Sequence, residues 1–154
     1  MPNMKNYTLV IPDQVGPFTD IAMLALLLFR EARGESYEAK VAVGCTVRNR
    51  TLHPSWYGKT YFEIITKKAQ FTSIHPPDGI FDPNLVVYPD PHDSTWKDCV
   101  LVAFDVIVGN VADPTGGALF YFDKSADKNP PPWATSYVHS ADIGNFHFYV
   151  PKVN

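Results

Sequence analysis

The chain has 154 residues, 45% of them hydrophobic, which is enough for one globular domain with a buried core and argues against disorder. The formal net charge is -3 and no basic stripe runs through the sequence, so nucleic acid is not expected as a partner. Cys45 and Cys99 lie in apolar helical patterns and are expected to be buried free thiols, with a disulfide between them as the alternative. No Cys/His group has zinc-ligand spacing, so neither a metal nor another cofactor is expected.

The N-terminal stretch, residues 1–19, is expected to be an extended arm, and residues 20–154 a single domain. The arm contains Pro12 and Pro17, and a helical pattern begins only after them. The apolar run 21–29 is much shorter than the roughly 20 residues that span a membrane, and no small-residue cleavage site follows it. We therefore expect neither a signal peptide nor stable membrane insertion.

The first expected helix begins after a cap at Thr19 or Asp20, continues to about Arg33 and stops at Gly34. Its residues are apolar nearly all round, which is typical of a central buried helix.

Three further helices are expected, each with a capping signal at its start. The expected spans run from Ser36 to about Arg50, from a Thr60–Glu63 capping box to about Lys68, and from Ser94 or Thr95 to Val108, closed by Gly109. Five prolines in the segment 73–93 predict a long loop before the last of these helices, and such loops are usually functional or variable.

The C-terminal third is expected to contain a small pair of strands. After a turn at 113–117, residues 118–122 read as a strand, a Pro-rich loop continues through Trp133, and a last strand covers 146–150. The predicted fold class is therefore α+β and mainly α, with a central buried helix, several surrounding helices and a small β element near the C-terminus.

The segment Arg30–Glu35 at the end of the first helix carries the strongest chemical signal. Steps of three or four residues from Leu24 reach Leu27, Leu28 and then Glu31, so this carboxyl continues an apolar stripe. Burial and the negative end of the helix dipole both raise the pKa of such a carboxyl. A carboxyl that stays protonated near neutral pH is what general-acid cleavage of a glycosidic bond requires.

Glu31 and Glu35 each have a second interpretation. Glu31 could instead pair with Arg30, Arg33 or Arg48 in a surface ion network. Glu35 could serve as a second carboxylate, about 5 Å from Glu31 in a retaining glycosidase or farther away in an inverting one. Its other interpretation is structural, as a partner of Arg33 or a capping group for the second helix.

Several other polar residues receive no chemical role. Asp113 is expected to bond its own backbone in the turn that it begins. His75, His92 and His139 are expected in loops with no partner pattern. No serine or cysteine has the context of a nucleophile, which argues against a serine or cysteine amidase.

A set of short motifs follows in a fixed order over about residues 20–150. In chain order they are Glu31-Ala-Arg-Gly-Glu-Ser-Tyr-Glu38, Val41-Ala-Val43, Val47-Arg-Asn-Arg50, Pro54-Ser55, Gln70-Phe71-Thr72, Asp113-Pro-Thr-Gly-Gly-Ala118 with Tyr121, Trp133-Ala134, Ile143-Gly-Asn145 and Phe148-Tyr149. This ordered set resembles the spore-cortex-lytic, SleB-like family of cell wall hydrolases.

The resemblance implies a lysozyme-like fold in a catalytic domain that cleaves peptidoglycan between N-acetylmuramic acid and N-acetylglucosamine, at the β-1,4 bond. It implies that Glu31 is the catalytic acid of a lytic transglycosylase, which forms a 1,6-anhydro sugar and adds no water. One carboxyl then acts first as acid and afterwards as base. A hydrolytic muramidase of the lysozyme type and a non-catalytic peptidoglycan-binding module are the alternatives.

The resemblance also implies a set of substrate-binding residues. They are Gln70, Phe71, Thr72, Gly116, Gly117, Tyr121, Trp133 and Tyr149. Gln70 would bond an N-acetyl group, and Tyr121 and Trp133 would contact the sugar. Plain packing is the alternative role of the aromatic residues, and turn geometry explains at least one of the glycines.

Two departures from the family pattern are evident. Relatives commonly have a histidine directly after Gly-Asn near the C-terminus, whereas here Phe146 takes that place and His147 follows. In a strand this shift moves the imidazole to the opposite face, and Phe146 becomes a core residue.

The second departure concerns export. Many relatives carry an export signal and a separate peptidoglycan-binding domain, and neither is evident here. A bare catalytic domain resembles a phage lysis enzyme released by a holin, or a virion-associated lysin. Such a protein is expected to be made in the cytoplasm and to act on the cell wall as a monomer.

Overall fold

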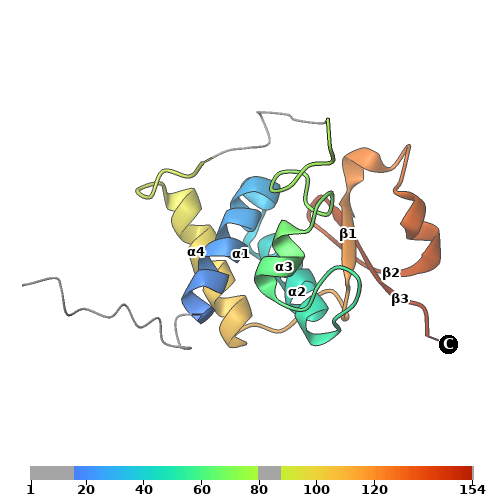
Figure 1. Ribbon diagram of the computed structural model, residues 1–154, viewed down its shortest axis with the longest axis horizontal. Helices are drawn as coiled ribbons and strands as arrows, with labels where there is room; N and C mark the ends of the chain where they lie inside the picture. The colour runs from blue at the N-terminus through green and yellow to red at the C-terminus, as the bar shows by residue number, and fades with distance from the viewer. Residues whose placement is uncertain (1–15, 80–87, 154) are drawn as a thin grey trace, which may run out of the picture.

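The computed structural model describes residues 16–79 and 88–153, which form four α-helices and one three-stranded sheet. The helices are α1 (Gly16–Ala32), α2 (Tyr37–Leu52), α3 (Tyr61–Thr66) and α4 (Ser94–Val108). The strands are β1 (Phe120–Asp123), β2 (Tyr137–Ile143) and β3 (Phe146–Pro151), and the 3-10 turns η3 (Lys124–Ala126) and η4 (Pro132–Ser136) lie between β1 and β2. Figure 1 shows α1 and α4 at one end of the molecule and the strands at the other, with α2 and α3 between them.

Helix α1 is the apolar helix expected from the sequence, but it begins earlier. Residues 16–19 belong to α1 and not to an extended arm, while residues 1–15 lie outside the described part. Thr19 Oγ1 donates to the carbonyl of Gly16 at 2.8 Å, so Thr19 lies within the first turn and does not cap it. Pro17 suits this turn because its missing N–H would have no partner inside the helix. Among the described residues, no helix combines the length and apolar character needed to cross a membrane.

The caps of the other helices follow the sequence signals closely. The caps predicted at Ser36 and Thr60 are confirmed, since each hydroxyl accepts a hydrogen bond from a backbone N–H three residues further on. The predicted cap of α4, Ser94 or Thr95, is wrong, because the cap is Asp93. Asp93 precedes that helix and accepts from the N–H of Thr95 at 2.9 Å, and Ser94 is already helical.

Helix α2 is buried more completely than α1, although it carries more polar residues. It contacts the other three α-helices and the sheet. Two of its buried polar side chains bond out of the helix: Asn49 Nδ2 donates to Asp113 Oδ2 at 2.8 Å and to the carbonyl of Ala118 at 2.9 Å, and Arg50 Nε donates to the carbonyl of Leu119 at 2.6 Å. These bonds fix the segment that leads into β1.

Both cysteines lie within this helical core. Cys45 on α2 and Cys99 on α4 are buried free thiols, as predicted. Burial raises the pKa of each thiol to about 11, so both stay protonated and unreactive at neutral pH.

The sheet has three antiparallel strands in the order β1-β3-β2, one strand more than expected. The additional strand is β2, and His139 lies within it and not in a loop. A bulge between His139 and Ala141 interrupts its pairing with β3. On β3, Phe146 and Phe148 are buried, and His147 lies on the opposite face, as the shift in the sequence predicts.

The long loop between α3 and α4 is confirmed for the residues that are described. Neither 73–79 nor 88–93 contains a helix or strand. The rest of the predicted loop, 80–87, lies outside the described residues.

Candidate active site

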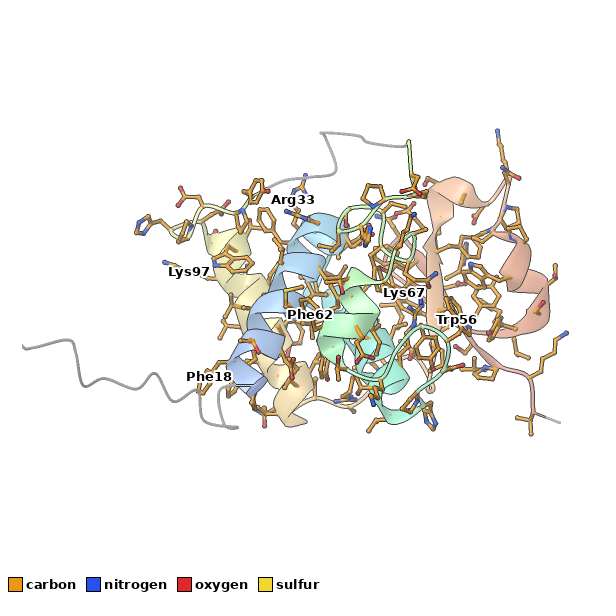
Figure 2. All side chains as sticks on the ribbon, in the orientation of Figure 1. Phe18, Arg33, Trp56, Phe62, Lys67 and Lys97 are labelled. Atoms are coloured by element: carbon orange, nitrogen blue, oxygen red, sulfur yellow. The ribbon has the colours of Figure 1, made fainter. Side chains whose placement is uncertain are left out.

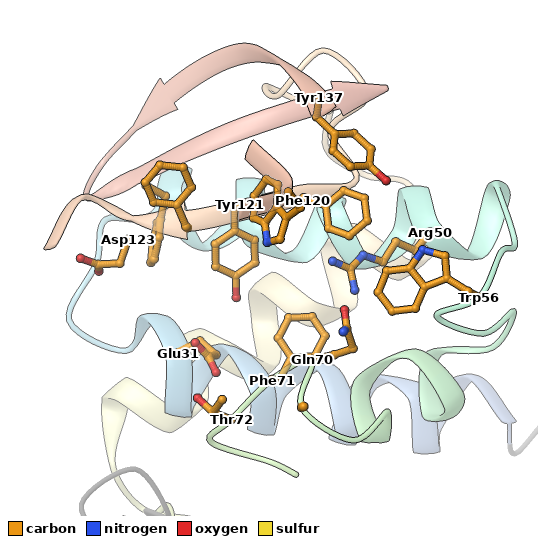
Figure 3. A pocket seen from close by; sticks show the side chains of 14 residues that line it. Glu31, Arg50, Trp56, Gln70, Phe71, Thr72, Phe120, Tyr121, Asp123 and Tyr137 are labelled. Atoms are coloured by element: carbon orange, nitrogen blue, oxygen red, sulfur yellow. The ribbon is translucent and has the colours of Figure 1, made fainter. Parts of the chain in front are cut away.

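A cavity of about 380 Å³ lies between the sheet and the layer formed by the end of α1 and the segment after α3 (Figure 3). Five of the predicted substrate-binding residues line it: Gln70, Phe71, Thr72, Tyr121 and Trp133. Glu31 also lines the cavity, from the last turn of α1. The sequence signals therefore converge on one concave site of a size typical of ligand pockets.

Ser73 holds the carboxyl of Glu31 in place. Its Oγ donates to Glu31 Oε1 at 2.5 Å, and its backbone adds a second hydrogen bond to the same carboxyl. Ser73 is itself buried, and its carbonyl accepts a hydrogen bond from Arg30 Nη1 at 3.0 Å. Arg30 and Glu31, which are neighbours on α1, thus both bond Ser73. The bond from Ser73 Oγ orients the Glu31 carboxyl towards the cavity.

The pKa of Glu31 is raised above its ordinary value. The main cause is burial, which disfavours the charged form, and the nearby negative charge of Asp123 acts in the same direction. The hydrogen bonds from Ser73 oppose these effects without outweighing them. A raised pKa keeps a larger share of this carboxyl protonated near neutral pH, which is the state a general acid needs.

The contacts of two candidate arginines do not support the surface ion network that was the alternative for Glu31. Arg33 Nη1 donates to the carbonyl of Phe29 at 3.2 Å, and Arg48 Nη1 donates to the carbonyl of Val106 at 3.0 Å. The carboxyl of Glu31 instead bonds Ser73 and faces the cavity.

Two buried polar groups that line the cavity have no hydrogen-bond partner among the described residues. They are the hydroxyl of Tyr121 and Nη1 of Arg50. In Figure 3 the Tyr121 hydroxyl points from β1 into the cavity, on the side of Glu31. Leaving a buried donor unpaired costs about 1–3 kcal/mol, so each group is suited to bind a polar atom of a ligand.

The charges of these two groups follow from their surroundings. Burial raises the pKa of Tyr121 well above its ordinary value, and the carboxylate of Glu31 adds to this effect, so the phenol stays neutral. Burial lowers the pKa of Arg50 to about 10, which still leaves a cation at neutral pH. The Arg50 guanidinium lies 4.5 Å from the centroid of the Phe120 ring, over its face.

Aromatic rings form much of the remaining wall. Trp56 stacks on Phe120, with ring centroids 6.2 Å apart and planes 18° apart, and Trp133 lies 5.3 Å from Phe120. Trp56, labelled among the side chains of Figure 2, lines the cavity and is about half exposed. Flat apolar faces beside polar donors suit a sugar ring, which has both kinds of surface.

Sequence reasoning missed three of the polar or exposed residues of the cavity. Arg50 stands in the Val47–Arg50 motif, but at the end of a helix it resembles any surface arginine. Trp56 follows α2 in a stretch without a regular pattern. Asp123 ends β1 and caps η3 by accepting from the N–H of Ser125 at 2.7 Å, a role that gives no hint of its effect on Glu31.

Glu35 lies outside the cavity. Its Oε1 accepts from Asn145 Nδ2 at 2.7 Å, and a side chain added at Gly144 would place its Cβ 2.8 Å from Glu35 Oε2. Glu35 therefore supports the turn between β2 and β3, a contact that neither interpretation of this residue included. It borders a separate groove with Arg30 and Asn145, which meets the cavity at Glu31.

Gly116, Gly117 and Tyr149 also do not line the cavity. Both glycines have positive φ, at 72° and 90°, in the turn that Asp113 organises as predicted, by accepting from the N–H groups of Thr115 and Gly117. Turn geometry is thus sufficient to explain the glycines. The ring of Tyr149 stacks on Phe122, with centroids 5.6 Å apart, on the same face of the sheet as His147.

The fold and the site together define a class of protein. A mainly α domain with a small C-terminal sheet presents a desolvated carboxyl to an aromatic cavity, an arrangement found in enzymes that cleave glycans. Residues 34–149 match the family model described as Cell Wall Hydrolase, and the chain belongs to this family. The matched range begins three residues after Glu31.

Curated relatives of the chain are spore cortex-lytic enzymes. The enzyme of Oceanobacillus iheyensis is 34% identical over 104 residues, which are 68% of this chain and 32% of the relative. The enzyme of Bacillus subtilis is 32% identical over 114 residues, 74% of this chain and 32% of the relative. The chain thus spans about a third of the length of these relatives.

Two solved structures share the fold. The catalytic domain of the germination-specific lytic transglycosylase SleB from Bacillus anthracis has a TM-score of 0.62 and 28% identity, covering 95% of this chain and 98% of that one. The catalytic domain of the Bacillus cereus SleB protein has a TM-score of 0.61 and 26% identity, covering 97% of this chain and 100% of that one. The predicted family and fold class are confirmed.

Proposed function

We propose that the chain cleaves peptidoglycan glycan strands at the β-1,4 bond between N-acetylmuramic acid and N-acetylglucosamine, as a lytic transglycosylase. The observation that carries this proposal is the carboxyl of Glu31, which has a raised pKa and lies against an aromatic cavity. The relationship to spore cortex-lytic enzymes and to the lytic transglycosylase SleB supports the reaction class.

The reaction needs a single carboxyl. Glu31 donates its proton to the glycosidic oxygen, and the bond between that oxygen and C1 of the muramic acid breaks, which releases the 4-hydroxyl of N-acetylglucosamine. The Glu31 carboxylate then takes the proton of the muramic 6-hydroxyl, whose oxygen bonds C1 and closes the 1,6-anhydro ring. The acid is regenerated and no water is consumed.

The unpaired donors of the cavity supply substrate binding. The hydroxyl of Tyr121 lies on the side of Glu31, where it can bond an oxygen of the sugar next to the scissile bond. Arg50 Nη1 and the Gln70 side chain can bond the carbonyl oxygens of N-acetyl or lactyl groups. Trp133 offers an apolar face for the sugar ring.

Glu31 borders both the cavity and the groove beside Glu35. A glycan strand that follows both concavities would place sugars on either side of the acid, as cleavage within a strand requires. Peptidoglycan is accordingly the partner that we propose, with the cell wall as the place of action and the monomer as the active form.

Hydrolysis is the second candidate, and Asp123 is the observation that favours it. This carboxylate lines the same cavity and acts electrostatically on Glu31. If it activated a water molecule, the product would have a reducing muramic acid end in place of the anhydro ring.

Clearing of a peptidoglycan suspension tests the role of Glu31. Glu31→Gln keeps the shape of the side chain and removes the transferable proton, so we expect the clearing rate to fall by about 10²- to 10⁴-fold. Glu38→Gln is the matched control, because Glu38 is an exposed residue in the first turn of α2, and its rate should equal the wild-type rate. Glu35→Gln retains an oxygen that accepts from Asn145 and should lose less than about 10-fold, since its effect is on positioning only. A Glu31→Gln variant as fast as the control would refute the assignment.

A further inference from the structure

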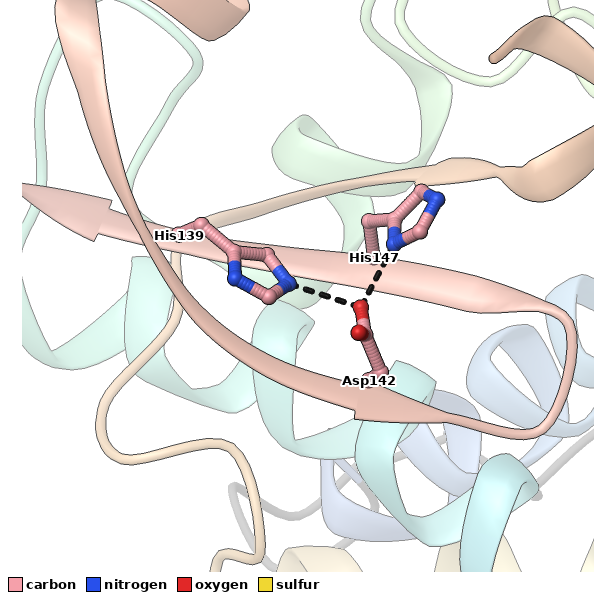
Figure 4. Close-up of side chains that lie close together, drawn as sticks. All are labelled: His139, Asp142 and His147. Carbon is pink, nitrogen blue, oxygen red and sulfur yellow. Dashed lines mark hydrogen bonds and ion pairs between the residues drawn. The ribbon is translucent and has the colours of Figure 1, made fainter.

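A second group of polar residues lies on the face of the sheet that carries His147. Asp142 Oδ1 is 2.7 Å from His139 Nε2 and 2.5 Å from His147 Nδ1 (Figure 4). One ligand atom from each of the three residues lies within 4.8 Å of the others. None of the three lines the cavity that contains Glu31.

The strand geometry brings these three side chains to one face. Asp142 and His147 are directly opposite each other in the pairing of β2 with β3. His139 and Asp142 are three residues apart, so in a regular strand they would face opposite sides. The bulge between His139 and Ala141 adds one residue to β2 and turns His139 to the side of Asp142.

One carboxylate oxygen therefore faces two imidazole nitrogens. His147 has a second carboxylate beside it, since its Nε2 is 2.7 Å from Asp127 Oδ1. A neutral imidazole has one N–H, so one of the two His147 nitrogens presents a lone pair to a carboxylate oxygen. That contact is repulsive unless a proton or a metal cation compensates it.

The contact with Asp127 is also the one expected beside a histidine that binds a metal. Histidines that bind a metal commonly donate their second ring N–H to a carboxylate, which fixes the tautomer and orients the ring. Asp127 follows η3 and lies outside the two strands, so it has this role without being part of the hairpin.

We propose that His139, Asp142 and His147 bind a divalent transition-metal cation of the zinc type, with Asp127 orienting His147. Two imidazole nitrogens and a carboxylate oxygen are a ligand set that suits zinc, and a tetrahedral ion would keep one position open. The cluster borders a solvent-exposed hollow, so that position faces water or a small ligand. The cation would join β2 to β3, and Asp127, which follows η3, would contact it only through His147.

The sequence shows no zinc-type spacing at this site because the ligands come from two strands and depend on a bulge.

The proposed cation site also contacts a residue of the cavity that contains Glu31. The ring of His147 lies 5.1 Å from that of Phe122, which lines the cavity that contains Glu31. An ion at this position would therefore stiffen the part of the sheet that forms one wall of the cavity.

Titration calorimetry on the untagged full chain, treated with a chelator and then dialysed, tests the proposal. We expect zinc chloride to bind with a stoichiometry of one and a Kd on the order of micromolar or tighter, and magnesium chloride to give no saturable heat, because imidazole ligands favour zinc over magnesium. Zinc should also raise the melting temperature, since it binds only the folded site.

Variants identify the ligands. His139→Gln and Asp142→Asn should abolish zinc binding, and Asp127→Asn should weaken it by about 10- to 100-fold. His92→Gln is the matched control, because His92 is an exposed histidine far along the chain from this cluster, and it should bind zinc as the wild type does. Melting curves without metal establish that each variant is folded.

Two results would overturn the proposal. The first is wild-type protein that shows neither saturable heat nor a melting shift with millimolar zinc, in which case protons hold the cluster together. The second is zinc binding that survives unchanged in folded His139→Gln and Asp142→Asn variants, which would place the ion elsewhere. Neither result would bear on the cleavage reaction proposed for Glu31.

Discussion

The side chains around Glu31 act on its pKa in opposite directions. Burial and the charge of Asp123 raise the pKa, while the hydrogen bonds from Ser73 lower it. The same bonds orient the carboxyl, so Ser73 combines a geometric role with an electrostatic one. Removing the hydroxyl of Ser73 or the charge of Asp123 should therefore shift the pH dependence of the reaction, each in the direction that its effect on the pKa of Glu31 defines.

Two substitutions separate these effects. The acid must be protonated, so activity should decline as the pH rises through the pKa of Glu31. Ser73→Ala removes a bond that stabilises the charged form and should shift this decline to higher pH. Asp123→Asn removes a negative charge and should shift it to lower pH. Initial clearing rates between pH 4 and pH 9 measure both shifts, and displacement of the two variants in the same direction would contradict this account.

The raised pKa also predicts how stability depends on pH. Glu31 has a higher pKa in the folded chain than in the unfolded chain. Its favourable contribution is therefore fully present below the unfolded pKa and is lost as the pH rises through the folded pKa. Glu31→Gln cannot ionise, so its free energy of unfolding should exceed that of the wild type increasingly as the pH rises from 4 to 8. Urea denaturation at several pH values measures the difference, and a difference that shrinks over this range would disprove the assigned shift.

At the scale of elements, the contact between α2 and the turn 113–117 positions the site. Asp113 accepts hydrogen bonds from Asn49 on α2 and from the backbone of the turn, and the turn leads into β1. Strand β1 in turn carries Tyr121 and Asp123 to the cavity. The carboxylate of Asp113 thus links the helical layer to the strand that lines the candidate site.

Asp113→Ala should destabilise the fold by about 3 kcal/mol, because it removes charge-assisted hydrogen bonds and leaves the buried amide of Asn49 with one partner fewer. Asp98→Ala on the exposed side of α4 is the control and should change stability by less than about 0.5 kcal/mol. Urea denaturation followed by circular dichroism compares the two. Equal stabilities would mean that the turn does not depend on this carboxylate.

The elements that were predicted correctly are those specified by neighbouring residues. The caps at Ser36 and Thr60 act within one helical turn, so the sequence alone locates them. Strand β2 was not predicted from the sequence. Its residues are exposed or half-exposed, and its bulge interrupts the alternation of apolar and polar residues by which a strand is recognised. The end of the arm was misplaced because Gly16-Pro17 resembles a stop signal but begins a helix.

In the candidate site, too, the residues that could be predicted are those whose signal lies within one segment of the sequence. Glu31 could be singled out because an acid that continues an apolar helical stripe is visible in one segment. Arg50 and Asp123 reach the cavity only through contacts between distant segments. The cluster of His139, Asp142 and His147 depends on strand register, which a single sequence does not specify.

For the whole molecule, the cavity lies where the helical layer meets the sheet, and each part contributes what the other lacks. The helical layer supplies the acid and the arginine, and the sheet supplies Tyr121, Asp123 and most of the aromatic wall. The proposed cation site lies on the side of the sheet that does not face the helices. The proposed cleavage of a glycan strand would use the acid, the unpaired donors and the aromatic wall together.

Mass spectrometry of the soluble products from purified peptidoglycan tests the central claim most directly. The wild-type chain is predicted to release fragments that end in 1,6-anhydro-N-acetylmuramic acid. Folded Glu31→Gln protein at the same concentration is predicted to release these fragments about 10²- to 10⁴-fold more slowly. Release of the same anhydro fragments by Glu31→Gln at the wild-type rate would contradict the assignment of Glu31 as the catalytic acid.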